Sequence, residues 1–233
     1  MNVTATGLTR ASGAAAAAAG ALFIGIQVGH PHLDSTSVQT TEMAVRDTLK
    51  VVMAALALVG TTGMYVSQVA RNGVLGLVGY VVLSAGYLLV LATSFTAAFV
   101  LPEIAETDPT YVDGVLDVTT GRTSSAPIGA LATVNQVQGL AYLAGGLLLG
   151  IALYRAGVLA RWAAALLAVG GVVTVALSLM PDAFYRLLAL PNGIAMIGLG
   201  VSLWLGQRSV TPEAGETLRR NHTVASGGTT ISA

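Results

Sequence analysis

Long apolar runs constrain this chain more than any other feature of its sequence. The hydrocarbon core of a bilayer is about 30 Å thick, so a helix that spans it needs roughly 20 largely apolar residues. Six segments meet that length, near residues 13–29, 48–69, 74–100, 128–153, 158–180 and 184–206. The alternative for the first, with its run of six alanines, is a secretory signal, but no Ala-x-Ala cleavage site follows it. The sequence therefore predicts an all-α, multi-pass membrane protein whose six transmembrane helices form a bundle within residues 1–206.

Composition excludes several classes of protein. Hydrophobic residues make up 54% of the chain and charged residues only 9%, whereas about a quarter of the residues in a soluble domain are charged. The chain has no cysteine, which excludes disulfides, thiolate metal sites and cysteine nucleophiles. Eleven Lys and Arg residues balance eleven Asp and Glu residues, so no basic excess is present for phosphate contacts. We therefore expect no nucleic-acid partner.

Arginines gather on one side of the predicted bundle. Short cytoplasmic loops of membrane proteins carry an excess of Lys and Arg. Seven basic residues share one side: Arg10, Arg71, Arg155, Arg161, Arg208, Arg219 and Arg220. Two acidic residues accompany them, while the other side has four basic and nine acidic residues. We therefore expect both termini in the cytoplasm and a bacterial plasma membrane as the location; the richness in Ala, Gly and Val is associated with a high-GC, actinobacterial source.

Two polar segments lie outside the predicted helices. The outer loop at 101–127 carries five acidic residues and one basic residue, Arg122. A connection of this length without regular structure is more often functional or disordered than idle. The tail at 207–233 is polar and lacks aromatic residues, so we expect a disordered cytoplasmic extension.

Polar side chains concentrate toward the outer ends of the predicted helices. Such groups are costly inside a membrane and usually face the bundle interior. We expect an outward-facing pocket with these ligand-binding candidates: Gln27, His30, Lys50, Thr93, Ser94, Asn135, Gln138 and Asn192. The alternative is that the amides and hydroxyls only tie helices together. Because residues three apart share a helix face, Asn135 and Gln138 should line the interior while Gln136 faces another helix or a headgroup.

Charged residues near the start of the second predicted helix allow two local ion pairs. Glu42 and Arg46 are four apart, and Asp47 and Lys50 are three apart, so each pair shares a helix face. Lys50 then has two alternatives: its stem snorkels outward, or its ammonium is the counterion of a bound acidic group. A similar pair, Asp182 with Arg186, has the spacing of a cap or an interface pair.

Two histidines superficially suggest a metal site. His30 and His32 flank Pro31 and precede Asp34, but two imidazoles and one carboxylate on a flexible stretch are weak evidence. The third histidine, His222, lies in the predicted cytoplasmic tail, on the opposite side of the membrane. We therefore expect neither a metal site nor any other cofactor.

The second half of the chain carries a pattern of Leu-Tyr-Arg, Arg-Trp and Leu-Pro pairs. They are Leu153, Tyr154, Arg155, Arg161, Trp162, Leu190 and Pro191. In these residues the chain resembles a bacterial family of six-helix integral membrane proteins known only as a domain of unknown function. The resemblance covers about two thirds of the chain and implies a fold but no reaction. The acidic loop and the alanine-rich first helix depart from the family pattern.

Three functions fit these features. The first is binding of a lipophilic small molecule or a membrane protein partner, among membrane lipids, in the outward-facing pocket. The second is a membrane-embedded terpene or isoprenoid cyclase, in which a buried neutral carboxylic acid protonates a prenylated substrate. Candidates for that acid are Asp47, Glu42, Asp182 and Glu103. The third is a small transporter, for which only Pro191-Asn192-Gly193 suggests a broken helix. The sequence does not decide whether the protein is an enzyme.

Overall fold

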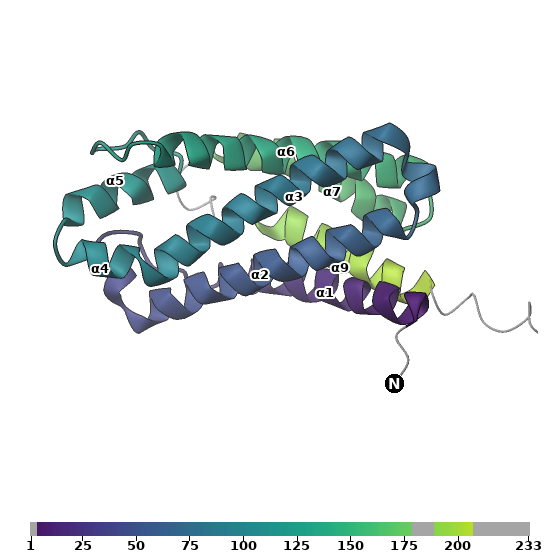
Figure 1. The fold of residues 1–233 in the computed structure, drawn as a ribbon, viewed down its shortest axis with the longest axis horizontal. Helices are drawn as coiled ribbons and strands as arrows, with labels where there is room; N and C mark the ends of the chain where they lie inside the picture. Colours follow the sequence, from purple (N-terminus) through teal and green to yellow (C-terminus); the bar gives the residue numbers. More distant parts are fainter. Residues whose placement is uncertain (1–3, 179–188, 207–233) are drawn as a thin grey trace, which may run out of the picture.

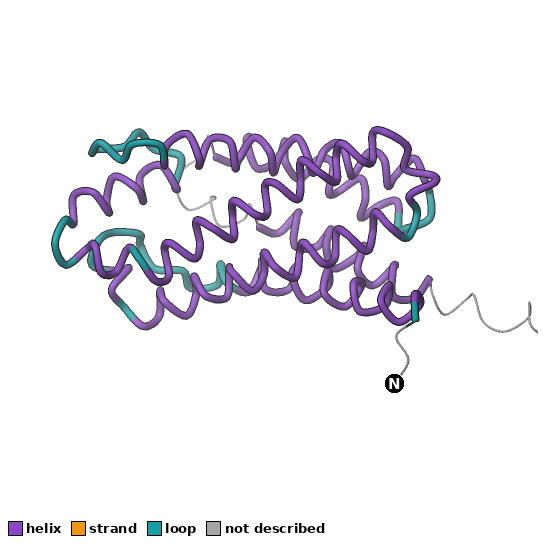
Figure 2. The backbone as a smooth tube through the Cα atoms, viewed as in Figure 1, coloured by secondary structure: helices purple, strands orange, loops and turns teal. Residues whose placement is uncertain are grey.

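The computed structural model describes residues 4–178 and 189–206, with the side chains of 172–178 left out. In this part of the chain all regular structure is helical and no strand occurs (Figure 2). Six helices are long: α1 (Ala5–Gly25), α2 (Thr41–Val66), α3 (Val69–Phe99), α6 (Leu131–Ala156), α7 (Arg161–Ser178) and α9 (Ala189–Gly206). Three elements are short: the 3-10 turn η1 (Ser37–Gln39), α4 (Leu101–Ala105) and α5 (Pro109–Thr119).

The long helices form a closed ring that follows the order of the sequence. Each packs against the next, from α1 through α2, α3, α6 and α7 to α9, and α9 returns to α1. The N-terminus lies at one end of this bundle, while α4 and α5 lie at the opposite end (Figure 1). Gly13 faces Gly200 and Gly20 faces Gly193, so α1 and α9 run antiparallel.

Five of these helices are long and apolar enough to cross a membrane: α1, α2, α3, α6 and α9. The chain is therefore a helical protein with the features of a multi-pass membrane protein, as its sequence predicts. Helix α7 occupies the fifth predicted segment, but its last side chains lie outside the described part. That α7 also crosses the membrane, which would make six spans, therefore stays a prediction. The positions of the two termini relative to the membrane also stay a prediction.

Helix boundaries differ from the predicted ones where polar caps begin a helix early. Helix α1 starts at Ala5 and not near residue 13, because the Thr4 hydroxyl accepts a hydrogen bond from the backbone N–H of Gly7. Helix α2 starts at Thr41 and not near residue 48, with Thr40 as the equivalent cap. Hydropathy alone misses these first turns because they are polar. At its other end, α1 stops at Gly25 and not near residue 29, so Gln27 and His30 follow it.

One glycine interrupts α3. Gly73 has φ 58° and ψ −163°, a conformation that L side chains rarely adopt, so only the stretch after it is regular helix. The predicted start at residue 74 matches this regular part.

The outer loop at 101–127 is the largest correction to the expected architecture, because it contains α4 and α5 where no regular structure was expected. Asp108 caps α5 by accepting from the Tyr111 N–H at 3.0 Å, and Pro109 occupies the first turn. Val112, Val115 and Leu116 then face inward at helical spacing. An Asp-Pro pair before apolar residues spaced by three and four is a helix signal that a search for long apolar runs does not detect.

The described residues form two apolar cores with no residue in common. The bundle core lies among the long helices and includes Met53, Leu83, Leu149 and Leu199. A second core lies at the end of the bundle, in a unit that we call the cap, made of residues 26–40 and 101–130. The cap core consists of Val38, Leu101, Ala105, Val112, Val115, Leu116 and Ile128.

Some predictions fall outside the described residues. They are the tail at 207–233, Asp182 with Arg186, the end of the helix predicted at 158–180 and the start of that predicted at 184–206.

Candidate functional site

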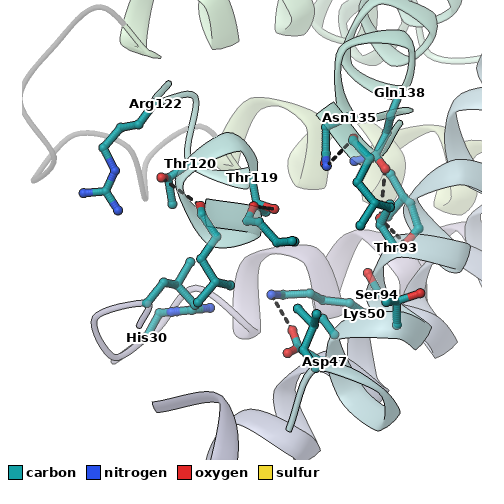
Figure 3. Close-up of a pocket in the computed structure, with 18 of the residues that line it drawn as sticks. His30, Asp47, Lys50, Thr93, Ser94, Thr119, Thr120, Arg122, Asn135 and Gln138 are labelled. Atoms are coloured by element: carbon teal, nitrogen blue, oxygen red, sulfur yellow. Dashed lines mark hydrogen bonds and ion pairs between the residues drawn. The ribbon is translucent and has the colours of Figure 1, made fainter. Parts of the chain in front are cut away.

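A cavity of about 360 Å³ lies where the long helices meet the cap, at the end of the bundle opposite the N-terminus (Figure 3). Its polar lining comes from the α1–α2 connection, α2, α3, α5, the segment after α5 and α6: Gln27, His30, His32, Asp47, Lys50, Thr93, Ser94, Thr96, Thr119, Thr120, Arg122, Asn135 and Gln138. Its apolar lining includes Val90, Ala97, Leu101, Val115, Leu116 and Leu131. This volume lies in the range of small-molecule sites, about 300–1,000 Å³.

The cavity brings together most of the ligand-binding candidates. Seven of the eight line it: Gln27, His30, Lys50, Thr93, Ser94, Asn135 and Gln138. On α6 the spacing argument is correct, since Asn135 and Gln138 face the cavity while Gln136 is exposed on another face.

Asn192 is the exception among the candidates. It lies on α9 and does not line this cavity. Its side chain is 4% exposed and fills the space over Gly170 of α7. Asn192 therefore belongs to the contact between two helices, the role that the alternative reading gave to buried amides.

Lys50 and Asp47 form an ion pair on the cavity wall. The Lys50 ammonium donates to Asp47 Oδ1 at 2.7 Å, and the Asp47 side chain is only 3% exposed. The spacing of three residues predicts this pair. Removing one partner of a buried pair leaves an uncompensated charge, which costs about 3–5 kcal/mol. Lys50 lines the cavity with its ammonium paired to Asp47. Its two alternatives, snorkelling or pairing with a bound acidic group, both stay predictions.

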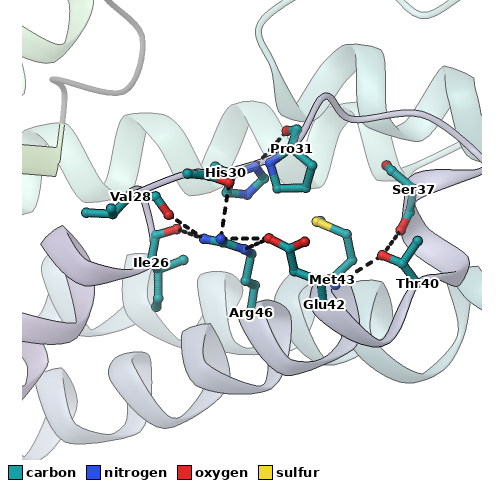
Figure 4. A network of polar contacts seen from close by, with 10 residues as sticks. Ile26, Val28, His30, Pro31, Ser37, Thr40, Glu42, Met43 and Arg46 are labelled. Atoms are coloured by element: carbon teal, nitrogen blue, oxygen red, sulfur yellow. Dashed lines mark hydrogen bonds and ion pairs between the residues drawn. The ribbon is translucent and has the colours of Figure 1, made fainter.

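Arg46 fixes the segment that brings His30 to the cavity (Figure 4). Its Nη1 donates to the carbonyls of Ile26 at 2.6 Å and Val28 at 3.0 Å, and its Nη2 donates to that of Gly29 at 3.2 Å. Nε and Nη2 also donate to Glu42 Oε1, at 3.0 and 2.8 Å. The planar guanidinium thus satisfies carbonyls at the end of α1 that have no partner within the helix. The pair with Glu42 was predicted from its spacing, but the carbonyl contacts were not.

His30 presents a neutral imidazole to the cavity. Its Nδ1 lies 2.9 Å from the Pro31 carbonyl oxygen, and since a carbonyl only accepts, Nδ1 carries the hydrogen. Burial is the main effect and lowers the pKa of His30 below 6.5. The Pro31 hydrogen bond opposes it, the positive charges of Lys50 and Arg46 lower the pKa further, and Asp47 raises it. With the ring neutral, Nε2 is a hydrogen-bond acceptor.

Hydroxyls on the cavity wall bond mainly to their own helices. Thr96 Oγ1 donates to the Ala92 carbonyl at 3.0 Å, and Thr120 Oγ1 lies 2.9 Å from the Asp117 carbonyl. Thr93 Oγ1 lies 2.9 Å from the Leu89 carbonyl and 2.8 Å from Gln138 Oε1.

Asn135 and Ser94 are two further polar residues of the cavity wall. Asn135 Nδ2 donates to the Leu131 carbonyl of its own helix at 3.1 Å. Ser94 is 7% exposed, and within the described residues its hydroxyl has no hydrogen-bond partner.

Acidic side chains of α5 connect the segments of the cap that cover the cavity. Asp113 of α5 accepts from the Ser35 backbone N–H at 2.7 Å and from the Ser35 hydroxyl at 3.2 Å, which joins segments 78 residues apart. Asp117 forms an ion pair with Arg122 at 3.2 Å. These contacts place Thr119, Thr120 and Arg122 at the cavity. Sequence reasoning missed all three because it treated their segment as an unstructured loop.

Of the described candidate acids for a terpene cyclase, only Asp47 lines the cavity. Its Oδ1 accepts from the Lys50 ammonium. Glu42 is paired with Arg46 and 56% exposed on its side chain, and it does not line the cavity. Glu103 is exposed on α4, and Asp182 lies outside the described residues.

Two other sequence features can be placed in the structure. Pro191-Asn192-Gly193 lies in the first described turn of α9, which begins at Ala189, so the helix break of the transporter alternative stays a prediction. His30 and His32 both line the cavity, but no group of three or more metal-ligating side chains gathers in the described part of the chain.

Comparison of the chain with protein-family models, with curated proteins and with solved structures finds no match. The resemblance to the six-helix family of unknown function therefore stays a prediction, and function has to be argued from the cavity itself.

Proposed function

We propose that this chain is a multi-pass protein of a bacterial plasma membrane that binds an amphiphilic small molecule in the cavity beneath the cap. The observation that carries this proposal is the cavity itself. Polar groups from six separate segments and an apolar wall converge on one space of about 360 Å³. A concave site of that size with an apolar wall and convergent polar groups is typical of small-molecule binding.

Hydrogen bonding distinguishes this proposal from the alternative that the polar groups only tie helices together. Of the wall contacts described above, only that between Thr93 and Gln138 joins two long helices. Thr96 and Asn135 bond within their own helices, and the Ser94 hydroxyl has no partner among the described residues. Helix association therefore accounts for one of these contacts and leaves the others without a structural reason to face a common space.

Charge supports an outward-facing cavity. At the N-terminal end of the bundle the described residues include four arginines, Arg10, Arg71, Arg155 and Arg161, and no acidic residue. The described residues from 30 to 127 at the cavity end include eight acidic residues against three basic ones, Arg46, Lys50 and Arg122, while Arg71 lies at the opposite end. Since basic residues favour the cytoplasmic side, the cavity end should face outward.

A matched pair of variants on α6 tests the binding function. The purified protein is extracted with organic solvent, and co-purifying amphiphiles are identified by mass spectrometry. We expect Gln138→Leu, which puts an apolar group on the cavity wall, to lose the bound species. Gln136→Leu changes the same residue type on an exposed face and should retain it. The proposal fails if the wild-type protein carries no amphiphile and takes up none from lipid vesicles.

A further inference from the structure

The hydrogen-bonding character of the cavity wall indicates what kind of polar group its ligand carries. A hydroxyl has one hydrogen to donate and two lone pairs that accept. Thr96 and Thr120 direct their hydrogens to backbone carbonyls of their own segments. Thr93 has one hydrogen for two nearby acceptors, the Leu89 carbonyl and Gln138 Oε1. These threonines therefore offer lone pairs to a ligand, and no hydrogens.

Two neighbours of the threonines are also acceptors. Asn135 uses Nδ2 in its bond to the Leu131 carbonyl, which leaves Oδ1 to accept. His30 holds its hydrogen on Nδ1, which leaves Nε2 to accept. A carboxylate or a fully ionised phosphate has no hydrogen to give to any of these groups, so it would face them without a bond.

Ser94 has a hydroxyl group that is available for a hydrogen bond to a ligand. More than nine-tenths of the residue is buried, its side chain lines the cavity, and it has no hydrogen-bond partner within the described residues. Its Oγ is not among the fully enclosed atoms without a partner, so it is reached from the cavity. A ligand hydroxyl, which both donates and accepts, can satisfy this serine and a neighbouring threonine at once.

The cations of the cavity are already compensated. Lys50 is paired with Asp47 at 2.7 Å, and Arg122 with Asp117 at 3.2 Å. The cap adds Glu103, Glu106, Asp108 and Asp113 without further basic residues. An anionic ligand would therefore enter a region with an acidic excess and find no unpaired cation among the described residues.

From these observations we infer that the polar end of the ligand is neutral and rich in hydroxyl groups, as in a glycerol or sugar headgroup attached to an alkyl chain. This inference rests on the proposed binding function. The alkyl part has an apolar wall available to it, in Val90, Val115, Leu116 and Leu131.

Binding to three amphiphiles of equal chain length tests the headgroup. The full chain is placed in lipid nanodiscs and titrated, with native mass spectrometry as the readout, with monododecanoylglycerol, dodecyl glucoside and dodecyl phosphate. We expect the glyceride or the glucoside to bind at least about tenfold more tightly than the phosphate, as expected from one or two additional neutral hydrogen bonds. Tighter binding of the phosphate would overturn the inference while preserving the binding function. Failure of all three to bind would count against the binding function itself.

Two serines of α3 provide a matched control. Ser94→Ala removes the hydroxyl in the cavity and should weaken binding of the hydroxylated amphiphile about three- to tenfold, the effect of one lost hydrogen bond. Ser84 is also a serine without a hydrogen-bond partner in the described part of the chain, but it does not line the cavity. Ser84→Ala should therefore leave binding unchanged. Equal affinities for the wild type and Ser94→Ala would contradict the assigned role of Ser94.

Discussion

Arg46 shows how much of the site depends on one side chain that does not touch the cavity. Its guanidinium donates hydrogen bonds to the carbonyls of Ile26, Val28 and Gly29, which follow α1. These bonds determine the path of the chain toward His30. The lysine ammonium is a point charge and cannot reproduce the planar set of donors.

We expect Arg46→Lys to lower the free energy of unfolding by about 2 kcal/mol. Hydrogen bonds to a charged group are each worth about 1.5–3 kcal/mol, and a lysine ammonium can keep only some of the hydrogen bonds that Arg46 makes. Thermal or denaturant unfolding in detergent measures the change. Glu42→Gln is the control: its side chain is 56% exposed, so loss of its charge should cost less than about 1 kcal/mol. A larger effect for Glu42→Gln than for Arg46→Lys would contradict the role given to the carbonyl contacts.

His30 should make stability depend on pH. Its pKa in the folded protein is lowered from 6.5, mainly by burial; the Pro31 hydrogen bond opposes this, while nearby Lys50 and Arg46 lower the pKa further and Asp47 raises it. The unfolded chain therefore binds the proton first as pH falls. Stability is highest above 6.5 and decreases as pH falls below that value, until the folded ring is also protonated.

We expect the midpoint temperature of thermal unfolding to decrease when the pH is lowered from about 7.5 to about 5.5, the range in which histidines titrate. The decrease should be smaller in His30→Asn than in the wild type. The asparagine amide can still donate to the Pro31 carbonyl. Asp34 does not confound this range, because hydrogen bonds from the Thr36 side chain and the Ser37 backbone lower its pKa from 3.8. Its stabilising contribution is lost only at still lower pH. Identical pH profiles for wild type and variant would exclude His30 as the source.

The sequence predicts residue contacts well where both partners share a helix. The pairs Glu42–Arg46 and Asp47–Lys50, and the different faces of Gln136 and Gln138, all follow from helical spacing. The Arg46 carbonyl contacts and the bond of Asp113 to Ser35 could not be predicted in this way, because they depend on how distant segments meet.

Close contact between helices is the main feature at the scale of elements. Helices α3 and α6 approach until backbone meets backbone: a methyl group at Gly145 would overlap the backbone of Leu83, and one at Gly79 would overlap that of Leu149. Small residues are what allow such approach between helices in lipid.

Gly145→Ala should therefore separate α3 from α6 and destabilise the protein by about 1–3 kcal/mol, the usual cost of overpacking. Gly139 lies on the same helix, and a methyl group there would meet nothing within 4 Å. Gly139→Ala should be neutral or slightly stabilising, since alanine favours helix. Unfolding of both variants under the same detergent conditions measures the difference, and equal stabilities would show that this contact tolerates a methyl group.

The sequence located apolar helices correctly and missed polar and amphipathic ones. The apolar middle of each long helix was located correctly in the described part, because length and hydropathy define it. The polar first turns of α1 and α2, and all of α4 and α5, were missed because caps and amphipathic spacing define them. The missing cap helices also explain why Thr119, Thr120 and Arg122 were not among the candidates.

At the scale of the whole molecule, charge divides the bundle into a basic and an acidic end. The net charge of zero hides this division, because the two ends nearly cancel. The positive-inside tendency predicts that the arginine-rich end faces the cytoplasm and the cavity the outer side.

Single cysteines test this orientation cleanly, because the natural chain contains none. Thr6 at the start of α1 and Thr107 between α4 and α5 are both exposed. In intact cells of a bacterial host, a membrane-impermeant maleimide should label Thr107→Cys fully and Thr6→Cys only after lysis. The reverse pattern would place the cavity in the cytoplasm and overturn the outward orientation.

The separation of the two cores has a consequence for how such a protein can diversify. Substitutions in the cap core, around Val112 and Leu116, reshape the roof of the cavity without changing a residue of the bundle core. One part of the cavity wall can therefore vary while the packing of the long helices is kept. The other part, including Ser94 and Gln138, lies on the long helices themselves and changes only with them.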